Sequence, residues 1–277
     1  MKIIENVSLK EKSNIKIGGI AKEIIYIESY DDFTKLLGKD LFVLGNCSNI
    51  LFSDDYIDKS FIILDSINSI EEIEKGIYEV GAGLKFTNFI SYLNKKNYGG
   101  LEELAGIPGT VGGLTAINAG AYGKEIFENI LEVEYFDKNL NLFRKKIEDI
   151  EFSYRSSEFK KNKDIITKVV FKTQMGYDLV KVLELLTQRK NKQPLDYPNL
   201  GSVFKNPENN YAAKLLEKSN LKGVKVGGAK VSTKHANFII NYDNAKFEDV
   251  IELIEICKQE VYSIHNINLE EEIIIVK

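Results

Sequence analysis

The sequence predicts a mixed protein of the α/β or α+β class, and three observations support this class. Short runs rich in β-branched and aromatic residues alternate with segments of helical periodicity. Glycine and other turn formers bound these runs. No low-complexity segment and no internal repeat interrupts the alternation. With 277 residues, 44% of them hydrophobic, the chain is long enough for two or three lobes.

Five runs have the composition of β-strands, because each combines β-branched or aromatic residues with flanking turn formers. They are 41–45, 60–65, 76–83, 130–137 and 165–173.

Three segments have apolar residues at helical spacing. The first covers 84–97 and is expected to end at Gly99, which suits a C-terminal cap. The second runs from Tyr177 to Arg189 and the third from Phe247 to Ile264. Its apolar face predicts that Cys257 is an ordinary core residue. The face consists of Phe247, Val250, Ile251, Ile254, Cys257, Val261 and Ile264.

Composition excludes several classes of function. A net charge of -4 and a pI near 5.5 argue against a nucleic-acid partner, although a local basic pocket for small phosphates remains compatible with them. The first residues lack the apolar core of a signal peptide, and no run approaches the roughly 20 apolar residues of a membrane span. We therefore expect a cytoplasmic protein that does not enter a membrane. The two cysteines and two histidines have no metal-ligand spacing, so no metal site is expected.

One break in composition suggests a domain boundary. Residues 188–202 hold two of the four prolines and follow directly on a predicted helix. The glycine-rich loops all precede this break, which predicts a nucleotide-holding half followed by a smaller lobe.

Two glycine-rich loops are candidates for binding phosphate. "LGNCSNIL" (44–51) and "GIPGTVGG" (106–113) would let backbone N–H groups approach a diphosphate without a Cβ in the way. Neither loop matches the dinucleotide fingerprint or the phosphate loop of nucleotide hydrolases. Tight turns would explain either loop equally well.

Two polar residues have alternative interpretations. Arg155 in "EFSYRSSEF" (151–159) is suited to grip a carboxylate bidentately, or it forms a surface ion pair. Ser202 in "GSVFKNP" (201–207) is not part of a nucleophile elbow. As a very weak acid it is a useful proton donor only to a strongly basic centre such as a carbanion, and otherwise it caps a turn.

Read together, the motifs resemble one family, the UDP-N-acetylenolpyruvoylglucosamine reductases, which make UDP-N-acetylmuramate for peptidoglycan. Seven segments match this family in order over some 250 residues. They are "KIGGIA" (16–21), "GNCSNIL" (45–51), "GIPGTVGG…NAGAYG" (106–123), "YRSS" (154–157), "GSVFKNP" (201–207), "GGAKVSTKHANFIIN" (227–241) and "LEEEI" (269–273).

The resemblance implies an α+β fold with an FAD-binding part of the vanillyl-alcohol-oxidase type, made of two α+β subdomains, and a C-terminal α+β substrate-binding lobe. The implied bounds are 1–62 and 63–190 for the FAD-binding subdomains, 191–268 for the substrate-binding domain, and 269–277 for a segment that returns to the FAD-binding half.

FAD is expected to bind non-covalently in the two glycine loops, with NADPH as cosubstrate. Gly81 belongs either to the same site or to a turn at the end of a strand. The residues expected to bind FAD are Gly45, Asn46, Cys47, Ser48, Asn49, Ile50, Gly81, Gly106, Ile107, Pro108, Gly109, Thr110, Gly112, Gly113, Ala116, Ala119, Gly120 and Tyr122.

The implied chemistry is a hydride relay from NADPH to the flavin and then to the methylene carbon of an enolpyruvyl sugar nucleotide. In the family, the arginine matching Arg155 stabilises the developing negative charge and the serine matching Ser202 supplies a proton. A glutamate that polarises the enol carboxyl matches Glu272, with Glu270 as the alternative because successive glutamates allow a shift of register.

The other implied contacts and partners are small molecules. Arg189, Lys205 and Asn206 are expected to bind the sugar nucleotide, and His235 is expected to be structural. Arg189 and Lys192 form a basic pair at the domain junction that either meets the diphosphate or is solvated surface charge. We expect a monomer or a weak dimer. An FAD-dependent oxidase of the same superfamily, or a nucleotide-binding module without catalysis, are the alternatives to the reductase.

The sequence departs from the family pattern at three points. Cys47 stands where the family usually has glycine, and Ile20 stands where it usually has proline. The segment between Phe171 and Tyr177 lacks the insertion that caps the substrate in longer members, so the chain resembles the shorter subtype.

Overall fold

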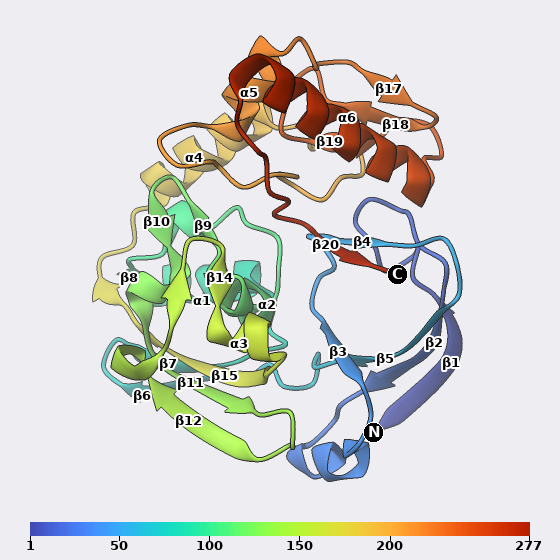
Figure 1. The fold of residues 1–277 in the computed structure, drawn as a ribbon. Coiled ribbons are helices and arrows are strands. Elements are labelled where there is room, and N and C mark those ends of the chain that lie inside the picture. The colour runs from blue at the N-terminus through green and yellow to red at the C-terminus, as the bar shows by residue number, and fades with distance from the viewer. The chain divides into compact units, whose positions relative to one another are not determined.

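The computed structural model describes residues 1–277, which divide into two compact units (Figure 1). We describe each unit separately. The first unit consists of Met1–Glu5, Glu23–Asn46 and Lys59–Thr187. The second consists of Asn6–Lys22, Cys47–Asp58 and Gln188–Lys277. The bounds expected for the subdomains stay a prediction.

A five-stranded antiparallel sheet forms the centre of the first unit. Its strand order is β12-β11-β15-β7-β6, and the middle strands align Val133 with Val169 and Val169 with Val80. The strands are β6 (Ile70–Glu74), β7 (Ile77–Gly81), β11 (Ile130–Phe136), β12 (Leu142–Lys146) and β15 (Ile165–Lys172).

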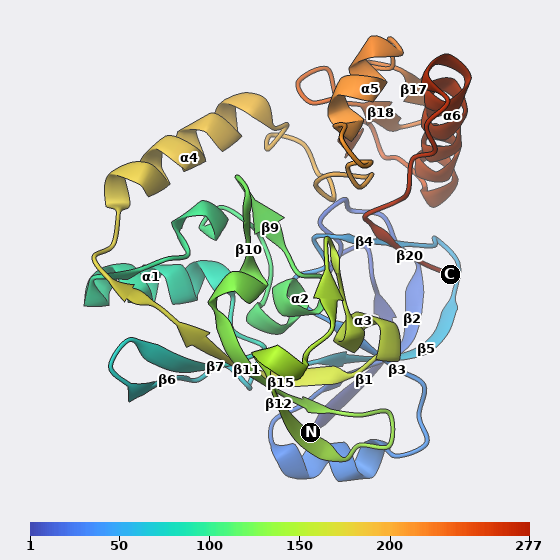
Figure 2. The ribbon, with the colours of Figure 1, turned by 60° about the vertical axis from the view of Figure 1, so that its left-hand side comes forward.

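Helices α1 (Phe86–Lys96) and α2 (Val111–Ala116) lie on one face of this sheet (Figure 2). The Phe89 ring of α1 contacts the rings of Tyr78 and Phe171, with centroids 6.2 and 5.1 Å away. All three side chains are fully buried. Burial of such large apolar side chains is the main force that holds helix and sheet together, at about 1.5–3 kcal/mol for each.

Charged side chains occupy the other face of the sheet. Arg144 on β12 forms ion pairs with Glu79, Glu132 and Glu134 at 2.7, 3.1 and 2.8 Å. Lys168 also pairs with Glu79. Glu79 and Glu134 are buried, and the Tyr30 hydroxyl of the 3-10 helix Tyr30–Leu36 also donates to Glu134 at 2.5 Å, so this face combines paired charges with a partial cover.

A second sheet has the strand order β1-β2-β5-β3, and β3 and β5 are parallel. Its strands are β1 (Lys2–Ser8), β2 (Ile20–Tyr26), β3 (Leu41–Leu44) and β5 (Ile57–Ile63), and the 3-10 helix η1 (Tyr30–Leu36) connects β2 with β3. The chain passes between the two units within β1, β2 and β5.

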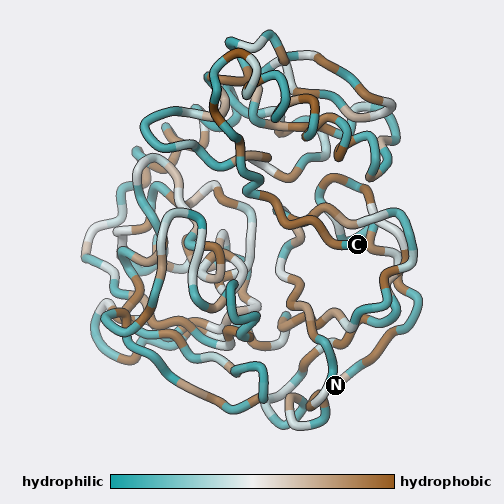
Figure 3. The backbone as a smooth tube through the Cα atoms, in the orientation of Figure 1, coloured by the Kyte–Doolittle hydropathy of each residue, from teal (hydrophilic) through white to brown (hydrophobic).

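The second unit packs α5 (Ala212–Lys218) and α6 (Phe247–His265) with a small antiparallel sheet. This sheet has the order β17 (Lys225–Val226), β18 (Ala229–Val231) and β19 (Ile239–Asn241). The last strand, β20 (Ile274–Val276), pairs in parallel with β4 (Ile50–Phe52). Figure 3 shows the change from hydrophilic to hydrophobic residues as the chain enters β20.

The remaining elements are short, apart from α4 (Leu179–Lys192). No helix is long and apolar enough to cross a membrane. The short elements are η2 (Glu102–Leu104), η3 (Ile126–Asn129), η4 (Ile147–Asp149), α3 (Glu158–Asn162), β8 (Tyr98–Gly99), β9 (Gly120–Ala121), β10 (Lys124–Glu125), β13 (Phe152–Ser153), β14 (Ser156–Ser157) and β16 (Gln174–Met175).

The five predicted strands and three predicted helices are confirmed, and two details of them are wrong. Helix α1 ends at Asn97, not at Gly99, because Asn97 adopts the left-handed conformation of a C-terminal cap at φ 58°. On α6 the prediction for Cys257 is confirmed, since it is buried. Ile264 is instead 54% exposed, and Leu253 takes part in the buried face.

Candidate functional site

Gly45 of the first predicted FAD loop and Thr110 of the second lie close together in the first unit. A Cβ on Gly45 would lie 2.7 Å from Oγ1 of Thr110, which is closer than real Cβ contacts come. Only glycine therefore fits at position 45 while Thr110 keeps this rotamer. This close approach joins the loop after β3 to the loop before α2.

Thr110 also organises the start of α2. It is the N-cap residue, and its hydroxyl accepts a hydrogen bond from the Gly113 amide at 3.2 Å. A Cβ on Gly112 would meet the Ala82 Cβ at 2.7 Å, so the helix can pack closely against the end of β7 only with glycine at 112. Because the glycines of 106–113 have no Cβ atoms, the backbone groups of this loop are not covered by side chains at these positions.

Asn118, in the "NAGAYG" segment, was missed by sequence reasoning. Its side chain is fully buried, and its Nδ2 donates to Glu125 and to the Ser153 carbonyl. Its Oδ1 is buried without a hydrogen-bond partner. A buried acceptor without a donor suits a ligand with hydroxyl and imide donors, as FAD has. The loops therefore fit FAD by both their close backbone packing and this unpaired acceptor.

Gly81 and the nearby Gly83 have a structural reason to be glycine. A Cβ would lie 2.4 Å from the Ile67 carbonyl oxygen at Gly81 and 1.8 Å from the Leu64 carbonyl oxygen at Gly83. The Gly81 amide already donates to Ser69 at 2.8 Å. Of the two interpretations offered for Gly81, this geometry supports the tight turn at the end of a strand.

Cys47 has the backbone conformation that glycine prefers. Its φ is 47°, in the left-handed region, and its side chain is buried. An L-residue in this region costs roughly 1–2 kcal/mol relative to the right-handed one. The loop conformation at position 47 is therefore one that glycine adopts without this cost.

Replacing Cys47 with glycine is expected to leave FAD bound and the enzyme active. Glycine relieves the left-handed strain, which raises stability. The greater flexibility of the glycine backbone and the loss of thiol packing lower stability, so the free energy of unfolding should change by about 1 kcal/mol or less. Flavin absorbance after purification and thermal unfolding measure both effects. Cys47→Ala is the control, because it keeps the strain, and it should be less stable than Cys47→Gly. Loss of flavin from Cys47→Gly would contradict the placement of FAD in this loop.

Arg155 lies in a two-residue turn between β13 and β14. Its φ is 56°, again left-handed, and its guanidinium lies 4.7 Å from the centroid of the Tyr154 ring. Nη2 donates to the Gly120 carbonyl at 2.7 Å and Nη1 to the Asn118 carbonyl at 3.4 Å. These contacts hold the half-buried guanidinium against the "NAGAYG" segment, and a strained backbone of this kind is typical of functional positions.

The hairpin that carries Arg155 is fixed to the FAD loop by side-chain hydrogen bonds. The Ser157 hydroxyl donates to the Ala116 carbonyl at 2.7 Å, and Asn118 donates to Ser153 at 3.0 Å. A Cβ on Gly120 would lie 3.0 Å from Nη1 of Arg155, so glycine at 120 gives the guanidinium its room. The "YRSS" and "NAGAYG" motifs therefore form one structural element.

Ser202 and Glu272 lie on neighbouring segments of the second unit. The Glu272 amide donates to the Val203 carbonyl at 2.7 Å, so the residue after the serine pairs directly with the glutamate. Both Ser202 and Glu272 are half-buried. Asn49 of the first glycine loop contributes here, because its Nδ2 donates to the Glu272 carbonyl at 3.1 Å. Arg155 belongs to the first unit.

Glu270 and Glu272 have different surroundings. Glu270 is exposed, and its carboxylate forms an ion pair with Lys205. Glu271 pairs with Lys258 on α6 at 3.0 Å. The Glu272 backbone is the one held by both Val203 and Asn49. The Glu272 backbone thus adjoins the segment of Ser202 and Val203, and the choice of Glu272 over Glu270 stays a prediction.

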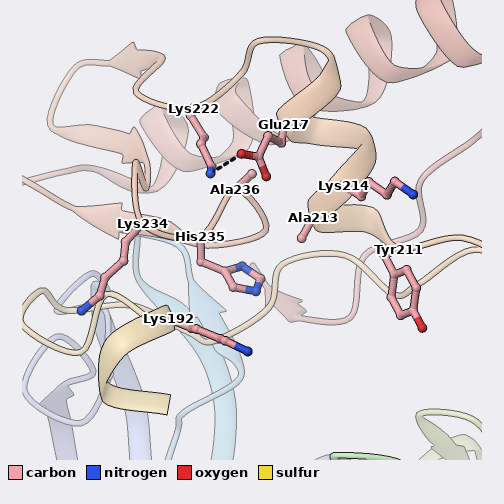
Figure 4. Close-up of a pocket in the computed structure, with 9 residues that line it drawn as sticks. All are labelled: Lys192, Tyr211, Ala213, Lys214, Glu217, Lys222, Lys234, His235 and Ala236. Atoms are coloured by element: carbon pink, nitrogen blue, oxygen red, sulfur yellow. Dashed lines mark hydrogen bonds and ion pairs between the residues drawn. The ribbon is translucent and has the colours of Figure 1, made fainter. Parts of the chain in front are cut away.

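An open cavity of about 390 Å³ in the second unit has a cationic lining (Figure 4). Its wall includes Lys192, Lys214, Lys222 and Lys234. The only carboxylate in the lining is Glu217, which pairs with Lys222 at 2.6 Å and leaves three lysines in excess. A local basic pocket thus exists in an acidic protein, and its charge suits a phosphate-bearing ligand.

His235 and Tyr211 add two rings to this cavity. Burial is the main cause that lowers the pKa of His235, and the positive charge of Lys222 lowers it further. The imidazole is therefore neutral near pH 7. Its Nδ1 accepts the Asn237 amide at 3.3 Å, which is consistent with the structural role expected for it. Figure 4 shows Lys192 and His235 near each other, with Tyr211 at the start of α5.

The three residues expected to bind substrate are not part of the cavity lining. Lys205 is paired with Glu270, and the Asn206 side chain accepts the Ala212 amide at the start of α5 at 3.1 Å. Arg189 lies on α4, one turn before Lys192, which does line the cavity. Lys192, the other member of the predicted basic pair, lies in the cavity lining, and the binding of substrate by Arg189, Lys205 and Asn206 stays a prediction.

Comparisons with known proteins agree with this geometry. The FAD-binding domain profile matches residues 33–142, and the profile of the C-terminal domain of UDP-N-acetylenolpyruvoylglucosamine reductase matches residues 193–276. The chain is 40% identical to the UDP-N-acetylenolpyruvoylglucosamine reductase of Fusobacterium nucleatum over the full length of both proteins. It therefore belongs to the UDP-N-acetylenolpyruvoylglucosamine reductase family.

Other members of the family agree in sequence and in structure. The reductase of Caldicellulosiruptor bescii is 39% identical, with 99% of this chain and 90% of the relative covered. The crystal structure of the Thermus caldophilus reductase matches with a TM-score of 0.86 at 28% identity, covering 100% of this chain and 98% of that one. The α+β FAD-binding fold is thereby confirmed. The chain is an FAD-containing oxidoreductase of peptidoglycan precursor synthesis.

Proposed function

We propose that the protein reduces the enolpyruvyl group of UDP-N-acetylglucosamine enolpyruvate with NADPH, giving UDP-N-acetylmuramate. The observation that supports this proposal is the backbone pairing of Glu272 with Val203, which brings the segment of Ser202 beside the segment of Glu272. FAD, when bound in the glycine loops, supplies the hydride that it has received from NADPH. Every other requirement of the reaction falls to side chains of this chain.

Arg155 is proposed to stabilise negative charge on the substrate carboxylate. When a hydride reaches the methylene carbon, charge develops on the α-carbon and its carboxylate. A guanidinium already oriented by the Gly120 carbonyl and the Tyr154 ring needs little reorganisation to bind that charge. The left-handed backbone at Arg155 lowers the stability of the folded protein, and it would be retained because it places the guanidinium for the reaction.

Ser202 is proposed to donate the proton that completes the reduction. Its hydroxyl proton passes to the α-carbon, and the resulting alkoxide regains a proton from water. Such a weak acid is effective only toward a strongly basic centre, and a carbanion-like α-carbon is one. Glu272, held next to Ser202 through Val203, is proposed to polarise the enol carboxyl group.

The cationic cavity is proposed to bind the diphosphate of the sugar nucleotide. Lys192, Lys214 and Lys234 supply the excess positive charge, and ammonium groups bind phosphate as point charges. Asn206 contributes by accepting the Ala212 amide at the first residue of α5, the helix that carries Lys214. Arg189 and Lys205 remain candidates for outer contacts with the same group. We place the reaction in the cytoplasm, where it would supply precursors for cell-wall growth, cell shape and division.

NADPH and the sugar nucleotide are expected to compete for one site, because the same flavin face must accept and then deliver a hydride. Initial rates of NADPH oxidation should depend on the enolpyruvyl sugar nucleotide and give parallel double-reciprocal lines, with inhibition at high substrate. Intersecting lines would indicate a ternary complex and contradict the shared site. NADPH oxidation that requires oxygen instead of the sugar nucleotide would contradict the reductase function.

A further inference from the structure

Asn237 is a buried asparagine that makes hydrogen bonds with both polar groups of one peptide residue. Its Oδ1 accepts the Phe204 amide at 2.9 Å, and its Nδ2 donates to the Phe204 carbonyl at 2.8 Å. The side chain is only 4% exposed. The side-chain amide of Asn237 thus pairs with the N–H and C=O groups of Phe204 in the way that the backbone of a neighbouring β-strand would.

The backbone of Asn237 extends the same pairing toward Ser202. Its carbonyl accepts the Val203 amide at 2.8 Å. The Val203 carbonyl in turn accepts the Glu272 amide. Val203 and Phe204 therefore form hydrogen bonds with Asn237, and Val203 also forms one with Glu272. Ser202 directly precedes these two residues. Gly201, before the serine, has a left-handed φ of 78°.

We propose that Asn237 is the positioning residue that fixes Ser202 relative to Glu272. It lies 33 residues from Phe204 along the chain, and its side chain and carbonyl hydrogen-bond to the backbone of Val203 and Phe204. Its role is to restrict where the Ser202 hydroxyl points, because a displacement of about 1 Å in a reacting group can cost 10²-fold in rate. This inference rests on the proposed function of Ser202 as proton donor.

The experiment compares Asn237→Ala and Asn237→Asp with a second asparagine, Asn241, which lies four residues further along the chain at the end of β19. Asn241 also uses its side chain to bond two backbone groups, the Ile15 carbonyl and the Ala245 amide, both at 2.9 Å. Asn241→Ala therefore removes a similar pair of hydrogen bonds that does not involve the serine segment. Stopped-flow flavin absorbance follows reduction by NADPH and reoxidation by the enolpyruvyl sugar nucleotide separately, and thermal unfolding measures stability.

Asn237→Ala is expected to be reduced by NADPH within a few-fold of the normal rate and reoxidised about 10- to 100-fold more slowly. Its solvent deuterium isotope effect on reoxidation should rise, because proton transfer becomes slower relative to hydride transfer. Asn241→Ala should lose similar thermal stability without this asymmetry. Asn237→Asp keeps one acceptor but loses the donor to Phe204, so it should show the same asymmetry if Asn237→Ala does not fold.

Three results would overturn the inference, and they are distinguishable. If both half-reactions of the Asn237 variants change equally, or match those of Asn241→Ala, then Asn237 is only structural. If Ser202→Ala itself reoxidises at the normal rate, the proposed role of Ser202 fails and the positioning role fails with it. Slow reoxidation in Ser202→Ala with normal reoxidation in the Asn237 variants removes the inference and leaves the proposed function intact.

Discussion

Ser202→Ala is expected to slow reoxidation of the flavin by the enolpyruvyl sugar nucleotide by about 10²–10⁴, the usual contribution of a general acid. Reduction by NADPH should stay within a few-fold of the normal rate, because no proton is required from Ser202 when NADPH delivers its hydride. The substitution leaves the backbone bonds of Val203 and Phe204 to Asn237 in place, so the fold of the segment should persist. Stopped-flow measurement of each half-reaction makes this comparison within one protein.

Ser202→Cys provides the matched control. A thiol is similar in size and a stronger acid than an alcohol, with an ordinary pKa near 8.5, so it retains a proton to donate. It should therefore reoxidise faster than Ser202→Ala. Normal reoxidation of Ser202→Ala would show that the proton comes from elsewhere. Equal slowing of both half-reactions would point to a damaged fold instead.

The strands and long helices could be predicted because their signals are local. The alternating apolar residues around Val80, Val133 and Val169 specify both the strand and its buried face. The end of α1 was predicted wrongly because asparagine, like glycine, adopts the left-handed conformation of a cap, and Asn97 comes first in the chain. The sequence alone does not say whether Asn97 or Gly99 forms the C-cap, because both residue types suit that position.

The polar network of the site could not be predicted from local patterns. Asn118 bonds Ser153 across 35 residues, and Asn237 bonds Phe204 across 33. A single sequence places these asparagines within motifs but does not say whether they are buried or which backbone they meet. The same limit applies to the cationic cavity, where Lys192, Lys214 and Lys234 come together from separate segments.

The candidates for catalytic residues have a different origin. Arg155, Ser202 and Glu272 were assigned from the family resemblance, and their roles stay predictions. What the structure adds is a physical context for each: a strained, oriented guanidinium at Arg155, and a backbone pair that joins the segments of Ser202 and Glu272. That context makes separate tests of charge and of backbone strain possible.

Arg155→Ala is expected to slow reoxidation by the sugar nucleotide by about 10²–10³, the usual cost of removing a preorganised group that stabilises developing charge. Sugar-nucleotide binding should also weaken, since the guanidinium contacts the carboxylate before and during the reaction. Reduction by NADPH should change by no more than a few-fold. Arg155→Lys keeps the charge but loses the planar fork that Gly120 and Asn118 orient, so its reoxidation rate should lie in between.

Arg155→Gly separates the charge from the backbone strain. Both alanine and glycine remove the guanidinium, but at φ 56° alanine retains the left-handed strain and glycine does not. Arg155→Gly should therefore resist thermal unfolding better than Arg155→Ala, by about 1 kcal/mol, while both reoxidise equally slowly. If Arg155→Gly reoxidised at the normal rate, the defect of Arg155→Ala would come from the backbone, and the proposed stabilisation of charge by Arg155 would be wrong.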